Sequence, residues 1–389
     1  MFDDIKNEAA AFSGRMSGWR RAFHRRPETA NNERETSAAL KSFFERLGIP
    51  VRTLAGTGLR ADLAGLPGGR TVALRADMDA LPLVEEGDKP YLSEIPGACH
   101  ACGHDGHMAA LMGAAEILAA RKNSFRGRVV FLCQPSEELP PGGAVPMIAE
   151  GALRGVDAIF GIHFWQSLPT GKIGLVKGTI MAQADNFRIT VTGRGGHGSM
   201  PHATADPIVA AGQLIVALQS VVSRNVDPLK PAVLSFGTVH GGSVYNIIPN
   251  EVRLSGTVRT LEPDVQTLMK KRLAEITEAT GRAGGVHTVL EYEDGYPPVV
   301  NPSDSVDFVV RTVESLWGRE AIAPFAPVMG GEDFAYYLQN IPGAFIFLGS
   351  GDGMPYPHHH PGFDLDERAL EPAAALLVAL AVSFLGGAE

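Results

Sequence analysis

Four short apolar runs, each followed at once by polar residues, constrain the fold of this chain more than any other feature. The runs are rich in β-branched and aliphatic residues and alternate with segments of helical spacing. They cover residues 71–76, 128–133, 157–162 and 343–349. This alternation predicts an α/β fold with a mostly parallel sheet flanked by helices.

Ligands bind beyond the carboxyl ends of the strands in open sheets of this kind, so we expect the polar residues that follow the runs to converge. These residues are Asp77, Asp79, Gln134, Glu137, Glu138, His163, His358, His359 and His360. The convergence would create one site from segments that are far apart in the sequence.

The segment between residues 185 and 294 has a different pattern. Its strictly alternating runs and its two stretches of helical periodicity occur in the order β-α-β-β-α-β. That order is the split βαβ pattern of a ferredoxin-like fold, so we predict an inserted domain over residues 185–294. The flanking segments, residues 1–184 and 295–389, then form one discontinuous α/β domain.

Composition and charge exclude several classes of partner. The chain has 389 residues and a net charge of −9, so it lacks the basic surplus that a nucleic acid partner requires. We expect no membrane association, because the longest apolar stretch, residues 373–387, is shorter than the roughly 20 residues of a bilayer span. It is typical of a buried helix. The N-terminal segment lacks the apolar run of a secretory signal, and three cysteines are too few for a disulfide framework. We therefore expect a cytoplasmic protein.

A dense cluster of metal-binding residue types lies within residues 99–107. It contains Cys99, His100, Cys102, His104, Asp105 and His107. Thiolate, imidazole and carboxylate groups at this spacing are typical of metal ligands. Cys99 and Cys102 also form a C-x-x-C motif, which leaves a redox dithiol or half of a structural zinc site as alternatives. A set of hydrogen-bonded polar residues at the start of a helix is a further alternative.

Other candidates follow the later strands. Glu137 and Glu138 are adjacent on a non-helical turn, so one carboxylate can bind a metal while the other addresses a water. Such pairs are also common on solvated surfaces, and the position after a strand end is what favours a functional role. His163 ends an apolar strand, where a histidine is either a hydrogen-bonded core residue or a ligand. Among the three histidines at 358–360 we expect one ligand.

The inserted domain carries candidates for substrate binding. His197 and His202 lie on a Gly-rich loop, where an exposed imidazole can donate to a developing oxyanion, although the loop is also compatible with an ordinary flexible connection. Asn246 supplies a neutral polar group, and the guanidinium fork of Arg259 suits a substrate carboxylate. The backbone N–H of Gly331, just before an expected helix start, offers a contact for an anion.

Ten segments, taken in order along the chain, resemble the M20 metallopeptidase family. The likeness is to its amidohydrolase branch, which includes hippurate hydrolases, N-acyl-amino-acid amidohydrolases and plant auxin-conjugate hydrolases. The segments are FHRRPE, LRADMDALPL, HACGHDGH, CQPSEE, GIHFW, GRGGHGSMPH, YNIIPNE, GTVRT, GGEDFAYY and HHPGFDLDE. The resemblance implies a catalytic α/β domain, an inserted lid domain that also forms a homodimer or a higher homo-oligomer, and two divalent metal ions per subunit.

The resemblance also implies roles for residues around the metals. The metal ligands would be Cys102, His104, Glu138, His163 and His359. Asp79 would orient these ligands, and Asp77 would lie behind them, at a position where other branches carry a metal-binding histidine. Three further residues fall outside the pattern, namely Cys99, His358 and His360.

The implied reaction is hydrolysis of the amide bond of N-acyl amino acids, hippurate-like or with N-acetyl or aryl-acyl groups, to a carboxylic acid and a free amino acid. Two metals would share a water and lower its pKa, and Glu137 would act as general base. His197 would reach an active site across the dimer, and Asn246 and Arg259 would bind substrate. Zinc, manganese, cobalt and nickel all suit such ligands. Alternatives are a dipeptidase or aminoacylase, an N-acetyl-diaminopimelate deacetylase of the same family, or a catalytically inactive relative that binds small molecules.

Overall fold

The computed structural model describes residues 1–386, and the chain forms two compact units. The core unit comprises residues 1–178, 300–326 and the chain from 333 onward, and the inserted unit comprises residues 179–299 and 327–332. The boundaries expected from the sequence, 184/185 and 294/295, lie six and five residues inside the inserted unit. The sequence gives no sign that residues 327–332 belong there. They do so because Val328 N donates to Ile180 O and Ala182 N donates to Val328 O.

The core unit is built on a seven-stranded sheet. Its strands are β1 (Val51–Leu54), β2 (Gly58–Ala64), β3 (Leu66–Asp77), β4 (Arg126–Gln134), β5 (Ala158–Trp165), β6 (Ile173–Gly174) and β15 (Gly343–Gly349). Their order across the sheet is β1-β2-β4-β3-β5-β15-β6. The four apolar runs become β3, β4, β5 and β15, which pair in parallel, whereas the strands at both edges are antiparallel. The predicted α/β fold with a mostly parallel sheet is confirmed.

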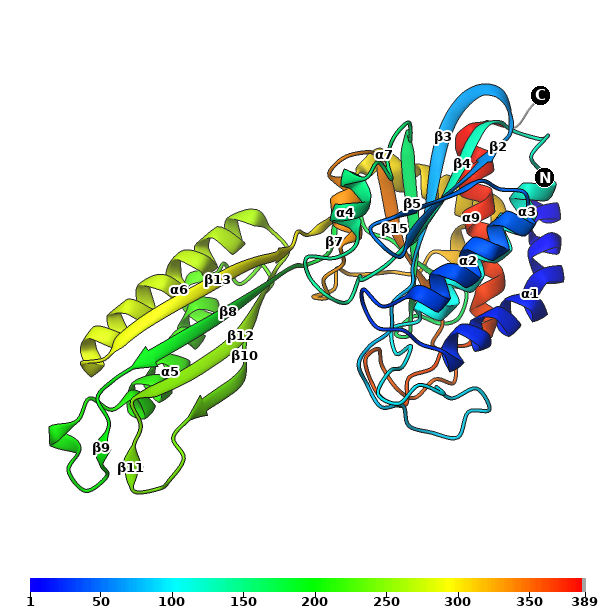
Figure 1. Cartoon of the computed structure of the whole chain (residues 1–389). Helices are drawn as coiled ribbons and strands as arrows, with labels where there is room; N and C mark the ends of the chain where they lie inside the picture. Colours follow the sequence, from blue (N-terminus) through cyan, green and yellow to red (C-terminus); the bar gives the residue numbers. More distant parts are fainter. Residues whose placement is uncertain (387–389) are drawn as a thin grey trace. The chain divides into compact units, whose positions relative to one another are not determined.

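Helices cover both faces of this sheet (Figure 1). They are α1 (Phe2–Arg25), α2 (Arg34–Arg46), α3 (His104–Ala120), α4 (Ala144–Ala149), α7 (Ser303–Trp317), α8 (Phe334–Leu338) and α9 (Leu370–Leu385). Alternate residues of β5 point to opposite sides. Phe160 packs against Phe308 of α7 and Phe384 of α9, whereas a Cβ at Gly161 would lie 2.7 Å from the ring of Phe334 in α8. The helices α1, α3 and α9 pack against one another on the α9 side.

The apolar stretch near the C-terminus forms α9, which is a core helix. Together with the turn before it, α9 forms the segment Glu367–Leu385, which is long and apolar enough to cross a membrane. However, 72% of the most apolar part of this segment is buried inside the protein. The helix α5 (Pro207–Asn225) of the inserted unit is also long and apolar enough to cross a membrane, and 33% of its most apolar part is buried. Core helices also pass this test of length and composition, and the burial of α9 identifies it as one.

The inserted unit has a four-stranded antiparallel sheet covered by α5 and α6 (Pro263–Gly284). Its strands are β8 (Gln183–Thr192), β10 (Ala232–Gly241), β12 (Glu251–Thr260) and β13 (His287–Tyr296), in the sheet order β10-β12-β8-β13. The chain order is therefore β-α-β-β-α-β, as the sequence pattern predicts. Beyond one end of the sheet, β9 (Gly196–His197) pairs with β11 (Ile247–Ile248). Two short strands, β7 (Gly178–Met181) and β14 (Val299–Asn301), span the points where the chain passes between the units.

Candidate metal centre

The carboxyl ends of the central strands gather the predicted polar residues at one edge of the core-unit sheet. The strand β3 ends at Asp77, β4 ends at Gln134, and His163 lies near the end of β5. The loop that follows β15 returns to this edge, because His359 N donates to Ala101 O at 2.8 Å. Segments separated by more than two hundred residues in the sequence thus share one site, as expected for a parallel sheet.

The residues expected to bind metal fall into two groups that share one thiol. The ligand atoms of Cys102, His104 and His163 lie within 4.8 Å of one another, and so do those of Cys102, Glu138 and His359. His163 Nε2 lies 3.5 Å from Cys102 Sγ, and His359 Nε2 lies 3.3 Å from Glu138 Oε1. The thiol of Cys102 thus belongs to both groups of three candidate ligands, and each group could hold a divalent cation.

The hydrogen bonds of two imidazoles leave their Nε2 atoms available to a metal. His104 Nδ1 donates to Asp79 O at 2.9 Å, and His163 Nδ1 donates to Phe164 O at 2.7 Å. Bonds of this kind fix the tautomer and the ring orientation of metal-binding histidines. His104 Nε2 is buried and has no hydrogen-bond partner among residues 1–386. A buried nitrogen without a partner is unfavourable, so this set of donors fits divalent cations.

Burial and nearby charges set the protonation of the ligands. Burial, reinforced by carboxylates that include Glu138, raises the pKa of the Cys102 thiol well above its usual value. Burial also holds the pKa of His163 well below its usual value, so this imidazole is neutral. Despite its burial, the charge of Asp77 raises the pKa of His104 to about 10. A divalent cation would take the place of the protons on Cys102 and His104, because metal ligands bind in their deprotonated forms.

Asp79 connects the two sides of the centre. Its carboxylate accepts hydrogen bonds from the backbone N–H groups of Glu137 at 2.9 Å and Glu138 at 3.0 Å, and its carbonyl holds His104. The turn before the two glutamates has Ser136 at a φ of 55°, a region that non-glycine residues rarely adopt. The Glu137 carboxylate is buried and lies within 4.8 Å of the ligand atoms of His104 and Glu138.

A buried ion network lies behind the ligands, and only two of its members, Asp77 and His107, are candidates by sequence. His107 Nδ1 donates to Asp77 Oδ1 at 2.6 Å, and Arg75 donates to Asp77 Oδ2 at 2.6 Å and to Asp333 Oδ1 at 3.1 Å. Asp77 Oδ2 lies 3.7 Å from His104 Nε2. The sequence did contain a signal for His107, since it follows His104 by three residues and so lies on the same helix face.

A second buried ion network lies beneath the start of α3 and joins Asp105, a residue of the candidate cluster, to Arg20 and His24, for which the sequence indicates no role. Arg20 Nε and His24 Nδ1 both donate to Asp105 Oδ2 at 2.8 Å, and His24 Nε2 donates to Glu85 Oε1 at 2.7 Å. Arg20, His24 and Asp105 are each 0% exposed. Although burial opposes it, the hydrogen bonds to Asp105 and Glu85 raise the pKa of His24. Both ring nitrogens therefore carry protons, and the imidazole is a buried cation.

The residues that the family pattern leaves out have other partners. His358 donates to a carbonyl of β5 and stacks on Trp165 with 4.8 Å between ring centroids, while His360 stacks on Tyr356 at 4.3 Å. Cys99 packs in a small apolar cluster, where burial raises the pKa of its thiol to about 12. The two cysteines of the C-x-x-C motif thus lie in different surroundings.

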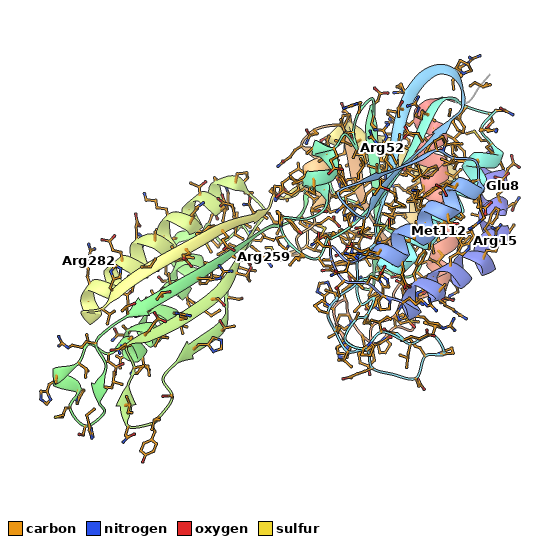
Figure 2. The ribbon with its side chains drawn as sticks, in the orientation of Figure 1. Glu8, Arg15, Arg52, Met112, Arg259 and Arg282 are labelled. Carbon is orange, nitrogen blue, oxygen red and sulfur yellow. The ribbon has the colours of Figure 1, made fainter. Side chains whose placement is uncertain are left out.

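The substrate-binding candidates of the inserted unit lie at opposite ends of its sheet. His197 and Asn246 lie together at one end, where β9 pairs with β11. Arg259, labelled in Figure 2, is near the other end of β12, in register with Ala184 of β8. Ala184 and Thr192 are eight residues apart on β8, which corresponds to roughly 27 Å of strand. Arg259 and the His197–Asn246 pair of one chain therefore cannot contact the same small molecule.

For two further candidates in the inserted unit, the described residues include no surrounding groups that would form a ligand-binding site. His202 is exposed in the short turn Pro201–Ala203. Gly331 is packed closely, since a Cβ there would lie 2.6 Å from Ala184 Cβ. The helix α8 begins at Phe334 and has five residues. The anion-binding role of Gly331 and the substrate role of His202 stay predictions.

A parallel α/β sheet whose strand ends hold clustered thiol, imidazole and carboxylate ligands around a buried carboxylate defines a metal-dependent hydrolase. The chain belongs to the peptidase family M20/M25/M40, whose sequence profile matches residues 73–383. It is therefore a hydrolase that acts on amide bonds.

Relatives with known names or structures extend over almost the whole chain. The N-acetyl-L-cysteine deacetylase of Bacillus subtilis (strain 168) is 42% identical over 375 residues, which cover 96% of this chain and 89% of that protein. The IAA-amino acid hydrolase ILR1-like 2 of Arabidopsis thaliana is 39% identical over 373 residues, 94% of this chain and 84% of that protein. The crystal structure of the Bacillus subtilis YXEP protein, a dinuclear metal binding peptidase of the M20 family, matches with a TM-score of 0.83 and 34% identity and covers 97% of this chain and 99% of that one.

Proposed function

We propose that this protein hydrolyses the amide bond of N-acyl amino acids at a centre of two divalent metal ions, releasing a carboxylic acid and a free amino acid. The observation that carries the proposal is the thiol of Cys102, which belongs to two ligand groups beside the buried Glu137 carboxylate. The names of two relatives, a deacetylase of an N-acetyl amino acid and a hydrolase of an amino-acid conjugate, support this substrate class. The dinuclear metal binding of the YXEP protein supports two metals.

The residues of the centre divide the chemistry between them. Divalent metals held by the two ligand groups would polarise the amide carbonyl and lower the pKa of a water. Glu137 takes a proton from the attacking water and later donates it to the leaving nitrogen. Asp79 keeps Glu137 and Glu138 in place by accepting hydrogen bonds from both backbone N–H groups. One glutamate can thus bind a metal while its neighbour moves the proton.

The layout of the inserted unit supports an active site that uses two copies of the chain. The Arg259 guanidinium suits the carboxylate of an amino-acid substrate. His197 and Asn246 of the same chain lie roughly 27 Å of strand away, so the partner subunit's His197 and the partner subunit's Asn246 would complete the site. His197 would donate to the developing oxyanion. We therefore propose a homodimer formed through the inserted unit.

The first experiment is to measure amine release from a panel of substrates. The panel contains N-benzoylglycine, N-acetyl amino acids, aryl-acetyl amino acids and dipeptides. Each is assayed before chelation, after chelation, and after re-addition of manganese, zinc, cobalt or nickel. We expect activity that disappears with the chelator and returns with a metal, because the ligand groups leave the reaction dependent on a divalent cation. The same panel ranks acyl groups and metals.

A matched pair of variants tests the division of roles between adjacent glutamates. Glu137→Gln should keep both metals and lower kcat by about 10²- to 10⁴-fold, the range for loss of a general base. Glu138→Gln should release metal on dialysis, because it removes a ligand. If a protein holding two metals hydrolyses no member of the panel, the N-acyl amino acid assignment is wrong. If Glu137→Gln hydrolyses substrate at the wild-type rate, Glu137 is not the general base.

A further inference from the structure

We propose that Arg20 of α1 is a positioning residue that sets the spacing between the two metal-binding segments of the core unit. One segment carries Cys102 and His104 before and at the start of α3, and the other carries His359 after β15. The inference rests on the proposed dinuclear centre and assigns a role to α1, which supplies no ligand. It follows from one buried guanidinium that bonds to both segments.

The guanidinium of Arg20 uses separate nitrogens for the two segments. Its Nε donates to Asp105 Oδ2 at 2.8 Å, and Asp105 directly follows His104. Its Nη2 donates to Asp364 Oδ1 at 2.5 Å, and Asp364 follows His359 by five residues. The planar fork of an arginine fixes the directions of these bonds. The guanidinium therefore holds the two carboxylates at a defined separation.

The carboxylates of Asp105 and Asp364 each accept a second hydrogen bond from another residue, and this bond restricts their movement relative to Arg20. His24 Nδ1 donates to the Asp105 carboxylate at 2.8 Å, and the Tyr91 hydroxyl donates to Asp364 Oδ2 at 2.8 Å. The Tyr91 ring also lies 4.9 Å from the Arg20 guanidinium carbon. The Arg20 side chain is 0% exposed, so water cannot replace a lost partner.

The link matters for metal binding because the two segments serve different ligand groups. Of the two groups that contain Cys102, one includes His104 and the other includes His359, and His104 also lies near Glu137 and Glu138. Each group could close around a divalent cation together with Cys102 only if the two segments lie at the correct separation. Groups behind metal ligands typically change metal affinity by about 10- to 100-fold when they are mutated. We expect an effect of this size from Arg20.

The same pair of helices offers a matched control. Arg121 at the end of α3 donates to Glu8 of α1 at 2.6 and 2.9 Å, so it also joins α1 to α3 through an arginine–carboxylate pair. Glu8, labelled in Figure 2, lies near the N-terminal end of α1, about two turns before Met16 and three before Arg20. Neither Arg121 nor Glu8 belongs to a ligand group or to either ion network described above. Arg121→Gln should therefore perturb helix packing without changing the metal centre.

The experiment is a cobalt titration of the metal-free full chain, followed by the ligand-field and thiolate charge-transfer absorption of bound Co²⁺. For the wild type we expect two equivalents with a thiolate signature. Arg20→Gln should lower the affinity for both ions by about 10- to 100-fold and shift the charge-transfer band. Arg121→Gln should leave the titration and the band unchanged, even where urea unfolding shows that it lowers stability.

A second variant keeps the test decisive if Arg20→Gln does not fold. Asp364→Asn removes one of the two carboxylates, Asp364 and Glu367, that the C-terminal segment presents to Arg20, at a side chain that is 17% exposed. It should weaken the cobalt ion bound by Glu138 and His359 more than the other ion, because Asp364 lies on the segment that carries His359. Folded Arg20→Gln with a wild-type titration would overturn the inference, as would Asp364→Asn with both sites unchanged or equally weakened. The cobalt titration contains no substrate, so it tests the positioning role of Arg20 without testing hydrolysis. A protein that binds two cobalt ions but hydrolyses no member of the substrate panel would contradict the proposed function and leave this inference standing.

Discussion

Two residues at the metal centre, Ser136 and His359, have backbone conformations that residues other than glycine rarely adopt. Their φ angles are 55° and 64°, and such conformations cost on the order of 1–3 kcal/mol each. The surroundings stabilise both. Ser136 N donates to the buried carboxylate of Glu33 at 2.8 Å, and His359 N donates to Ala101 O at 2.8 Å. The strain is thus located where the chain must aim Glu137 and His359 at the metal centre.

Asp79 is the residue at which a change of one atom type should be most informative. In Asp79→Asn, an NH₂ group replaces one carboxylate oxygen and faces a backbone N–H, so one of the two hydrogen bonds to the glutamate turn is lost. We expect kcat to fall by about 10- to 100-fold and metal to dissociate more readily. Steady-state kinetics and metal content after dialysis measure both effects. Asp62→Asn, which alters an ion pair with Arg60 away from the ligand groups, is the control. Unchanged kcat in Asp79→Asn would contradict this role.

At the scale of single residues, the sequence reveals contacts that follow from local spacing or from strand ends. Cys102 and His104 are two positions apart, and the position of His163 at a strand end predicts its place at the common edge. The partners of Arg20 could not be predicted in this way. Asp105 is 85 residues away and Asp364 is 344 residues away, and no periodic pattern indicates contacts over such separations.

At the scale of elements, α1 inserts a charged imidazole between two carboxylates of other segments. Despite burial, the hydrogen bonds from His24 and Lys89 lower the pKa of Glu85 to about 2, so this carboxylate stays ionised near neutral pH. The pKa of His24 is raised in the folded state. Stability from a raised histidine pKa is fully present below the unfolded value of about 6.5 and is lost as the pH rises through the folded value.

This linkage predicts a pH-dependent effect of His24→Gln. The variant should lower the free energy of unfolding more at pH 6 than at pH 9, because only the wild type loses the stabilisation of a charged imidazole as the pH rises. Urea unfolding of metal-free wild type and variant at several pH values provides the measurement. A difference between the two proteins that stays constant or grows with pH would show that His24 is not a buried cation.

Because α9 is a buried core helix, we expect substitutions that disturb its packing to lower the free energy of unfolding strongly. Leu380 is 0% exposed, and Leu380→Ala should lower the free energy of unfolding by about 2–5 kcal/mol, the range for buried leucines. Val145 on α4 of the same unit is 41% exposed, and Val145→Ala should change it by less than about 0.5 kcal/mol. Denaturant unfolding compares the two. Equal effects would mean that α9 is not packed as described.

Elements differ in how far the sequence determines them. The long runs that form β3, β4, β5 and β15 are predicted correctly, because an apolar strand buried on both faces has a distinctive composition. The two-residue strands β6, β9 and β11 are too short for any alternation to be visible. Their positions depend on backbone hydrogen bonds to distant segments, as does the assignment of residues 327–332 to the inserted unit.

At the scale of the whole molecule, the proposed shared active site predicts that two inactive variants restore each other. The His197→Ala chain retains Glu137 in its own metal centre. The Glu137→Ala chain retains His197, which would act in the active site of its partner. After reassociation at equal amounts, half of the dimers are mixed, and each mixed dimer has one complete site. We expect about a quarter of the wild-type activity, because a symmetric dimer presents two equivalent sites.

The control for this mixing experiment is the double variant His197→Ala/Glu137→Ala. Mixed with either single variant, it cannot form a complete site across two chains and should restore no activity. Subunit exchange is checked by tagging one variant and recovering the other with it. If exchange occurs and the single variants stay inactive together, His197 does not act in the partner's site.

The discontinuity of the core unit determines the order in which the chain can fold as it leaves the ribosome. The strand β15, which lies between β5 and β6 in the sheet, is encoded after residues 179–299 of the inserted unit. At about 5–20 residues per second, synthesis of residues 179–299 delays its appearance by about 6–24 seconds. During this interval the inserted unit can form its own sheet, while β5 has β3 on one side and no partner on the side that β15 will occupy. The nascent chain therefore exposes an unpaired, apolar strand edge until β15 is synthesised, and aggregation through this edge is most favourable during that interval.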